Sequence, residues 1–128
     1  MEPVAIVIGI ALLEYLYFSM KCGSMRGERG VAAPAMSGDA KFERYARVQY
    51  NTLEQLAIFL PAMVLFGHYV SSTVGAGIGL VFVLGRALYA RGYWVDPARR
   101  GPGFGLTLLA NLSLLIGGIV GAVLAYVG

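Results

Sequence analysis

Four long apolar runs dominate the hydrophobic pattern of the chain. They cover residues 3–21, 44–70, 74–93 and 104–127. A helix needs about 20 mostly apolar residues to cross the hydrocarbon core of a bilayer, and the runs have this length. The pattern predicts an all-α integral membrane protein in which four transmembrane helices form a single domain over residues 1–128.

The segments between these runs carry residues that interrupt helices. Residues 22–41 are rich in glycine, serine, proline and charged residues, which predicts one long loop. Small uncharged residues after Ser71 predict a tight turn. Residues 96–103 combine prolines and glycines with charges and predict a second polar connection.

Composition supports a membrane protein and excludes several other classes. Hydrophobic residues make up 58% of the chain and charged residues only 13%, whereas a soluble domain has about 25% charged residues. The mean hydropathy of +0.70 excludes a disordered or nucleic-acid-binding tail. The single cysteine, Cys22, excludes an intrachain disulfide, and no metal-binding spacing is present.

The basic residues predict the orientation of the chain. All ten lie near the first or the third connection. They are Lys21, Arg26, Arg29, Lys41, Arg44 and Arg47, followed by Arg86, Arg91, Arg99 and Arg100. Because Lys and Arg are retained on the cytoplasmic side of short loops, loops one and three are expected to be cytosolic, with both termini on the opposite side of an inner membrane or the endoplasmic reticulum.

Small residues recur at four-residue spacing in the last two runs, as Gly75 with Gly79 and Gly117 with Gly121. Such spacing lets helix backbones approach closely, and packing within one chain is the favoured interpretation. Four short spans enclose little volume, so a ligand site forms more easily between subunits than inside one. The sequence therefore favours an oligomer.

A polar stripe opens the second run. Arg44, Arg47, Asn51 and Glu54 are spaced three, four and three residues apart and share one helical face. An ionisable group at mid-membrane costs roughly 2.5–3.5 kcal/mol on insertion scales, so these groups need partners or a ligand. The structural alternative is that Glu43 pairs with Arg47 and that Glu54 pairs with an arginine of another helix.

A second stripe in the third run favours a ligand. Arg86, Tyr89 and Tyr93 are spaced three and four residues apart and approach the same end of the bundle. Arginines bind carboxylates with two parallel hydrogen bonds, Glu54 would receive an ammonium group, and Asn51 or Gln49 a peptide group. The two stripes together suit a short anionic peptide.

At these residues the sequence resembles the membrane-associated proteins in eicosanoid and glutathione metabolism, the MAPEG family, which includes microsomal glutathione transferases and leukotriene C4 synthase. The family pattern Phe-Glu-Arg-x-x-Arg-x-x-x-Asn-x-x-Glu is present at residues 42–54, and the second stripe follows in the same order and spacing. The resemblance covers nearly the whole chain.

The resemblance implies a homotrimer of four-helix subunits, with glutathione bound between subunits near the cytosolic side. It also implies the residues that contact glutathione. These are Arg26, Arg47, Gln49, Asn51, Glu54, Arg86, Tyr89 and Tyr93. Arg100 falls where the synthase-like branch carries the arginine that holds the thiolate, and Arg99 beside it is a second candidate.

The function implied is that of a glutathione transferase, a glutathione-dependent peroxidase, or both. Glutathione is the co-substrate, no metal is required, and a lipophilic electrophile or lipid hydroperoxide arrives from the membrane lipid. Gln55 and Gly27 depart from the leukotriene synthase pattern, which disfavours leukotriene synthesis.

Two alternatives remain open. The first is a non-catalytic, lipid-binding scaffold of the same family. The second is a small proton-coupled multidrug transporter that uses Glu14, a carboxylate inside the first apolar run. The arginine stripe disfavours the transporter, and Glu14 is expected to pair with a polar group of another helix.

Overall fold

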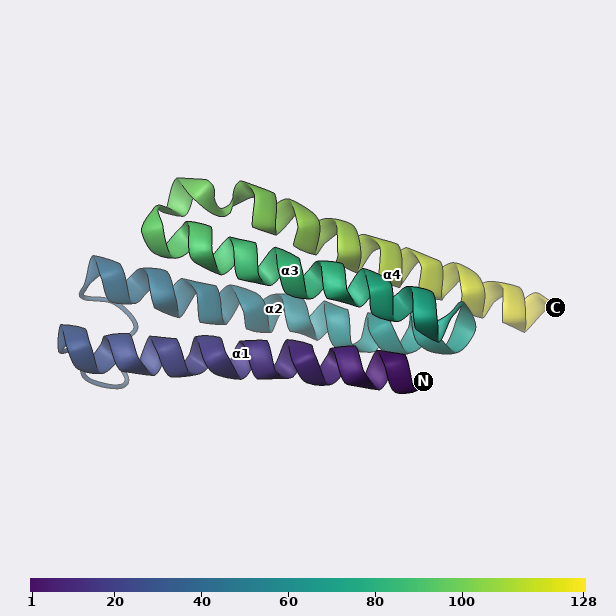
Figure 1. Cartoon of the computed structure of the whole chain (residues 1–128), viewed down its shortest axis with the longest axis horizontal. Helices are drawn as coiled ribbons and strands as arrows, with labels where there is room; N and C mark the ends of the chain where they lie inside the picture. Colours follow the sequence, from purple (N-terminus) through teal and green to yellow (C-terminus); the bar gives the residue numbers. More distant parts are fainter.

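The computed structural model describes residues 1–128 as an all-α protein, which confirms the predicted class. Its elements are α1 (Glu2–Arg29), α2 (Ala40–Tyr69), α3 (Ser72–Val95), a short 3₁₀ helix η1 (Pro97–Arg100) and α4 (Gly101–Val127). The four long helices lie side by side with alternating direction (Figure 1). The α1–α2 loop and η1 therefore lie at one end of the bundle, called here the loop end, and both chain termini lie toward the other.

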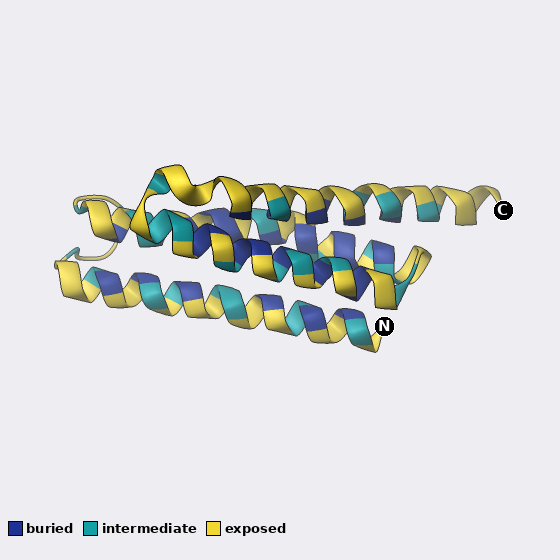
Figure 2. Cartoon of the chain, turned by 45° about the horizontal axis from the view of Figure 1, so that its top comes forward, coloured by how far each residue is buried: buried dark blue, intermediate teal, exposed yellow.

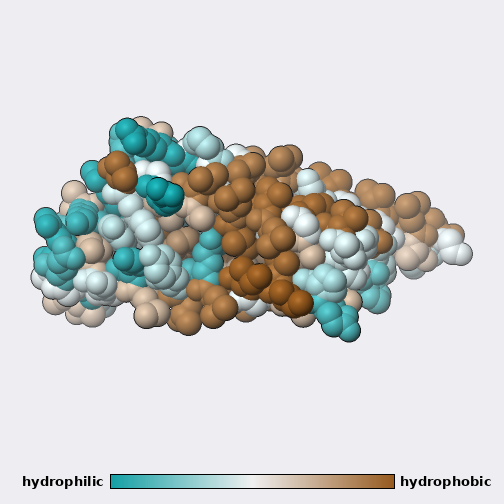
Figure 3. All heavy atoms as spheres, in the orientation of Figure 1, coloured by the Kyte–Doolittle hydropathy of each residue, from teal (hydrophilic) through white to brown (hydrophobic).

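Three of the helical segments are long and apolar enough to cross a membrane: α1, α3 and the segment 97–127. Helix α2 has 30 residues, but its first half carries the polar stripe. Exposed residues cover the outer faces of the helices (Figure 2), and many of them are large and apolar. Hydrophilic atoms gather at the loop end and hydrophobic atoms cover the middle (Figure 3), as expected for a bundle surrounded by lipid.

Helix α1 is longer than the sequence predicts. The predicted loop over residues 22–41 is wrong at its start, because the helix continues to Arg29 and ends at Gly30, whose φ of 69° is left-handed. Burial explains the difference, since Cys22 and Met25 pack against Phe42 of α2. Tertiary packing thus outweighs the low helix propensity of the glycines in this segment.

The predicted polar connection over residues 96–103 is also mostly helical. Asp96 accepts a hydrogen bond from the backbone N–H of Ala98 (3.1 Å) and caps η1. Pro97 and Pro102 each stand in the first turn of a helix, where proline is tolerated because its missing N–H would have no partner. Only Asp96 separates α3 from η1, which holds the arginines of η1 close to the end of α3.

A capping carboxylate fixes the start of α2. Asp39 accepts the backbone N–H of Phe42 (2.9 Å) and the Nε–H of Arg29 (3.0 Å). The hydrogen bond from Phe42 and the charge of Arg29 hold the pKa of Asp39 below its usual value. The end of α1 and the start of α2 are therefore tied together at the loop end.

The largest apolar core lies in the half of the bundle away from the loop end, where all four helices contribute to it. The rings of Phe59 and Phe82 stack at its centre with centroids 3.9 Å apart. Because this half is filled by apolar side chains, the arginines and tyrosines of the two polar stripes lie in the loop-end half.

Glycines allow the close helix contacts. A Cβ atom at Gly79 would lie 2.7 Å from Val7, and one at Gly117 would lie 2.6 Å from Phe66. Both contacts are within the chain, which confirms the interpretation of the four-residue glycine spacing as intrachain packing. The tightest approach is at Gly103 in α4, where a Cβ would lie 2.1 Å from the backbone nitrogen of Tyr89.

The substitution Gly103→Ala is therefore expected to push α4 away from α3 and to destabilise the protein by about 1–3 kcal/mol, the usual range for overpacking. Unfolding in mixed detergent micelles measures the effect. Gly105→Ala is the matched control, because a Cβ there meets nothing within 4 Å. Equal stability of the two variants would contradict the close approach of α3 and α4.

Candidate functional site

A buried guanidinium lies at the centre of the loop-end half. Arg86 of α3 is 0% exposed and donates to the Asn51 side-chain oxygen (2.8 Å) and to the Thr52 hydroxyl (3.0 Å from Nη2). It also donates to the hydroxyl of Thr107 in α4 (3.3 Å). One side chain thus joins α2, α3 and α4 by hydrogen bonds.

The network of Arg86 contains no acidic partner within ion-pair distance. Its guanidinium carbon lies 4.2 Å from the ring centroid of Tyr89, so the cation also interacts with an aromatic face. Neutral hydrogen-bond acceptors and an aromatic ring replace the water that a buried charge loses. The arrangement fixes Asn51 and Tyr89 in place.

A cavity of about 360 Å³ opens beside Asn51 and Tyr89. Its lining consists of Arg47, Asn51, Tyr89, Tyr93, Arg100 and Phe104. The two tyrosine rings stack with centroids 5.5 Å apart. Helices α2, α3 and α4 and the end of η1 therefore bring two guanidiniums, an amide and two phenols to one space, which we call the central cavity.

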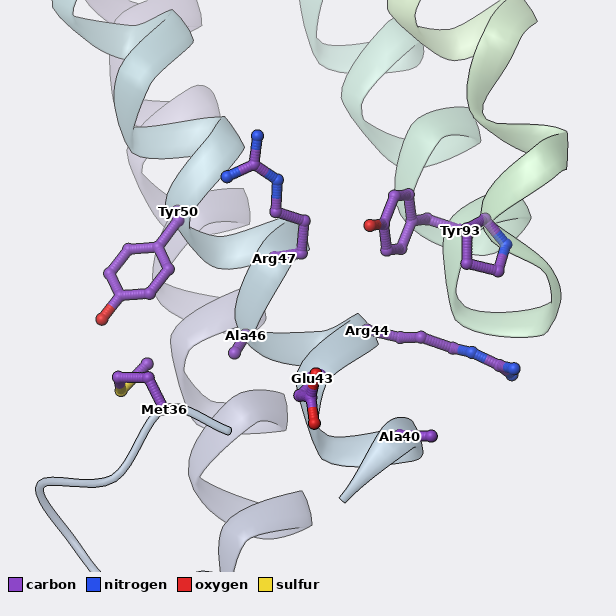
Figure 4. A pocket seen from close by; sticks show the side chains of 9 residues that line it. Met36, Ala40, Glu43, Arg44, Ala46, Arg47, Tyr50 and Tyr93 are labelled. Carbon is purple, nitrogen blue, oxygen red and sulfur yellow. The ribbon is translucent and has the colours of Figure 1, made fainter. Parts of the chain in front are cut away.

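A second cavity of about 480 Å³ adjoins the central cavity and shares Arg47 and Tyr93 with it. Arg47 and Tyr93 face each other across the opening between α2 and α3, and the Tyr93 hydroxyl points toward α2 (Figure 4). Arg44 extends below them and donates to the backbone carbonyl of Val95 (3.1 Å). The two cavities form one polar recess that reaches the loop end.

The charged residues of the α2 stripe do not neutralise one another. Glu43 accepts the backbone N–H of Gly38 (3.1 Å) and makes no ion pair with Arg47. Glu54 is exposed and has neither an ion pair nor a hydrogen bond within the chain. The structural alternative, in which these carboxylates pair with arginines, is wrong within this chain.

The structure gathers five of the nine predicted site residues in the central cavity. They are Arg47, Asn51, Tyr89, Tyr93 and Arg100. Arg86 lies directly behind them. Arg26, Gln49 and Glu54 line neither cavity of the recess. Gln49 donates to Ser19 of α1 (3.3 Å), and Arg26 donates to the carbonyl of Ala35 in the loop (2.7 Å).

The neighbouring arginines of η1 diverge. Arg100 lines the central cavity and donates to the carbonyl of Pro97 (2.8 Å). Arg99 lines a different cavity on the other side of α3, together with Arg91. The geometry therefore separates Arg100, the favoured candidate from sequence, from Arg99, the less well aligned one.

Three residues of the site were not found from sequence. Thr52 and Thr107 accept hydrogen bonds from Arg86, and Phe104 closes one side of the central cavity. Thr107 lies four residues before Asn111 in the apolar fourth run, and both are buried, so their helical spacing was one signal of a polar face there. A second signal was that a buried arginine requires acceptors from other helices.

Glu14 of α1 makes no ion pair within the chain, although its charge lies near enough to the Arg86 guanidinium to interact with it. One of its carboxylate oxygens is buried without a hydrogen bond, so the expected pairing with another helix is wrong within the chain. Glu14 lines a cavity of about 260 Å³ with Trp94 and other residues of α1 and α3, apart from the recess. No group of three His, Cys, Asp or Glu side chains is placed to hold a metal ion.

Fold and site together define a helical membrane protein with an arginine- and tyrosine-lined recess at one end of the bundle. Residues 4–120 match the model of the MAPEG family, and the chain belongs to this family. Its relatives include enzymes that use glutathione, which supports a glutathione-related transferase activity at the level of the family.

Three relatives illustrate the range of similarity. An uncharacterized protein of Synechocystis is 43% identical over 116 residues, covering 91% of this chain and 85% of that protein. Human microsomal glutathione S-transferase 2 is 38% identical over 101 residues, 77% of this chain and 69% of that enzyme. Leukotriene C4 synthase of Bos taurus is 33% identical over 95 residues, which cover 72% of this chain and 63% of that enzyme.

The substitution Thr107→Val tests the Arg86 network. Valine keeps the shape of the side chain but removes an acceptor, so one donor of a buried guanidinium loses its partner, at a cost of about 1–3 kcal/mol. Chemical unfolding in detergent is the measurement, and Thr73→Val at an exposed position of α3 is the control. A Thr107→Val protein as stable as the control would show that this hydrogen bond does not hold the helices together.

Proposed function

We propose that this protein is a membrane-bound glutathione transferase with glutathione-dependent peroxidase activity. The observation that carries the proposal is the central cavity, where α2, α3 and η1 bring Arg47, Asn51, Tyr93 and Arg100 together. Membership of a family with glutathione-using relatives supports glutathione as the co-substrate. The recess opens at the loop end, where a water-soluble peptide can enter.

The recess matches the charges of glutathione. The tripeptide carries two carboxylates, one ammonium group and two peptide bonds. Arg47 and Arg44 would bind carboxylates, since guanidinium and carboxylate pair in a bidentate geometry, and Asn51 would bind a peptide group. Arg86 is fully buried and lines neither cavity. We therefore assign it the role of holding Asn51 and Tyr89, rather than direct contact with glutathione.

Arg100 is proposed to activate the thiol. A free thiol with a pKa of about 8.5 is only a few per cent thiolate at neutral pH, and the thiolate is the nucleophile. A guanidinium beside the sulfur favours the charged form and lowers this pKa. The thiol proton passes to water, and the Arg100 charge stabilises the sulfur anion.

The second substrate would arrive from lipid. Phe104, at the edge of the central cavity, is 41% exposed, and Leu108 one turn further along α4 is 46% exposed, so an apolar surface leads from the outside of the bundle to the cavity. In the transfer reaction the thiolate forms a carbon–sulfur bond with the electrophile. A leaving group departs with the electron pair of the broken bond or, for an epoxide or activated alkene, the resulting anion takes a proton from water. In the peroxidase reaction two glutathione molecules reduce a lipid hydroperoxide to an alcohol and water and form glutathione disulfide.

We also propose a homotrimer with the binding site completed by a neighbouring subunit. Arg47 and Gln49 are two residues apart in α2, which is about 200° around the helix, so both cannot face one cavity of the same chain. Gln49 and Arg26 instead contact α1 and the loop. A second copy could present them to the recess of the first. The basic residues near loops one and three support our proposal that these loops lie in the cytosol.

The substitution Arg100→Gln tests the thiolate assignment. Ultraviolet difference absorbance during a glutathione titration at neutral pH measures the thiolate, and the variant is expected to lose it by tenfold or more, since one pKa unit corresponds to about 1.36 kcal/mol. Arg99→Gln is the matched control and should retain the signal. Glutathione that binds without forming thiolate in the unsubstituted protein would favour the scaffold alternative.

Mixed trimers test whether the site lies between subunits. Chains with Arg26→Gln and chains with Arg100→Gln are each expected to lose most activity alone. In the proposed trimer each site takes Arg100 from one subunit and Arg26 from its neighbour. A mixed trimer, purified through two tags, therefore contains one site in which both arginines are present and should recover activity. No recovery in mixed trimers would place Arg26 and Arg100 in the same subunit's site.

A further inference from the structure

A third cavity lies on the outer side of α3, at the loop end. It has a volume of about 360 Å³ and is lined by Leu88, Arg91, Gly92, Val95, Arg99 and Pro102. Two guanidiniums from α3 and η1 therefore flank one hollow whose other walls are mainly apolar. The roles proposed above use none of these residues.

The two arginines have no partner in the chain. Neither Arg91 nor Arg99 takes part in an ion pair, and both are exposed. The nearest acidic residue in sequence, Asp96, uses its carboxylate to cap η1. The hollow therefore carries net positive charge, which attracts an anion.

Backbone packing fixes the distance between the two arginine-bearing segments. A Cβ atom at Gly92 would lie only 2.4 Å from the carbonyl oxygen of Arg99, so the absence of a side chain at Gly92 lets η1 fold directly against α3. Arg99 is thereby held beside the turn of α3 that carries Arg91. The pair is part of a built surface and does not depend on a mobile loop.

The surface that continues from this cavity is apolar and exposed. Along α3, Leu84 is 54% exposed, Leu88 40% and Val95 64%, and these positions repeat at helical spacing on one face. Arg91 is two positions from Tyr89, about 200° around the helix, so this face points away from the central cavity. A ligand here would not compete for the glutathione site.

We infer that this cavity binds the phosphate head group of an anionic phospholipid, whose acyl chains lie along the exposed apolar face of α3. Guanidiniums bind phosphate oxygens with paired hydrogen bonds, and basic residues at the end of a membrane span attract anionic lipids. Charge at the rim followed by an apolar face along the helix matches the order of groups in a phospholipid. This favours a lipid over a free anion, which would use only the arginines.

The single tryptophan provides a local probe. Trp94 lines the neighbouring cavity, and Arg91 lines both that cavity and this one. The chain has no other tryptophan. The full-length protein is placed in phosphatidylcholine nanodiscs that contain a minor fraction of brominated phosphatidylglycerol, or the same fraction of brominated phosphatidylcholine. Bromine quenches nearby tryptophan, so the excess quenching by phosphatidylglycerol measures its local enrichment.

The expected result is a clear excess for phosphatidylglycerol that falls roughly tenfold in the double variant Arg91→Gln/Arg99→Gln. The charge-preserving variant Arg91→Lys/Arg99→Lys should retain most of it. The matched control Lys21→Gln/Lys41→Gln removes two charges from the same end of the bundle and should leave the excess unchanged. Retained glutathione binding verifies that each variant is folded.

Three results would overturn the inference. The first is no excess quenching, or an excess that survives in Arg91→Gln/Arg99→Gln. The second is an equal loss of excess quenching in the Lys21→Gln/Lys41→Gln control, which would indicate a general effect of surface charge. The third is full displacement by soluble glycerol phosphate at matched ionic strength, which would assign the cavity to a free phosphate anion.

Discussion

The buried guanidinium of Arg86 is the constraint on which the loop-end half of the structure depends. A charge in the interior of a membrane bundle requires polar partners, and Arg86 finds them on two other helices, at Asn51 and Thr52 of α2 and at Thr107 of α4. These contacts keep the helices in register where the largest apolar core ends. They also hold Asn51 and Tyr89, which line the central cavity.

From this centre the loop end divides into surfaces with separate roles. Arg100 and Arg99 are adjacent in sequence, yet one lines the central cavity and the other lines the outer cavity. A short helix after a single linking residue, Asp96, makes this possible, because consecutive side chains of η1 point in different directions. In our proposal the inner arginine acts on glutathione and the outer one holds lipid.

Helical spacing was sufficient to predict the four helices and much of the recess. Arg47, Asn51, Tyr89 and Tyr93 follow the periodicity of α2 and α3, and the structure brings them together. Contacts that depend on tertiary packing were not predictable, such as the acceptor role of Thr107 and the extension of α1 to Arg29. Gln49 shares the motif of Arg47 but faces α1, because it lies about 200° around the helix from Arg47. A match to a sequence motif does not by itself show which cavity a residue reaches.

The central claim is that glutathione binds in the central cavity with its sulfur beside Arg100. An electron cryo-microscopy structure of the protein in nanodiscs with saturating glutathione tests this most directly. The account predicts density for the tripeptide between Arg47 and Tyr93, with the sulfur in contact with the Arg100 guanidinium. Glutathione bound elsewhere, or with its sulfur directed away from Arg100, would contradict the account.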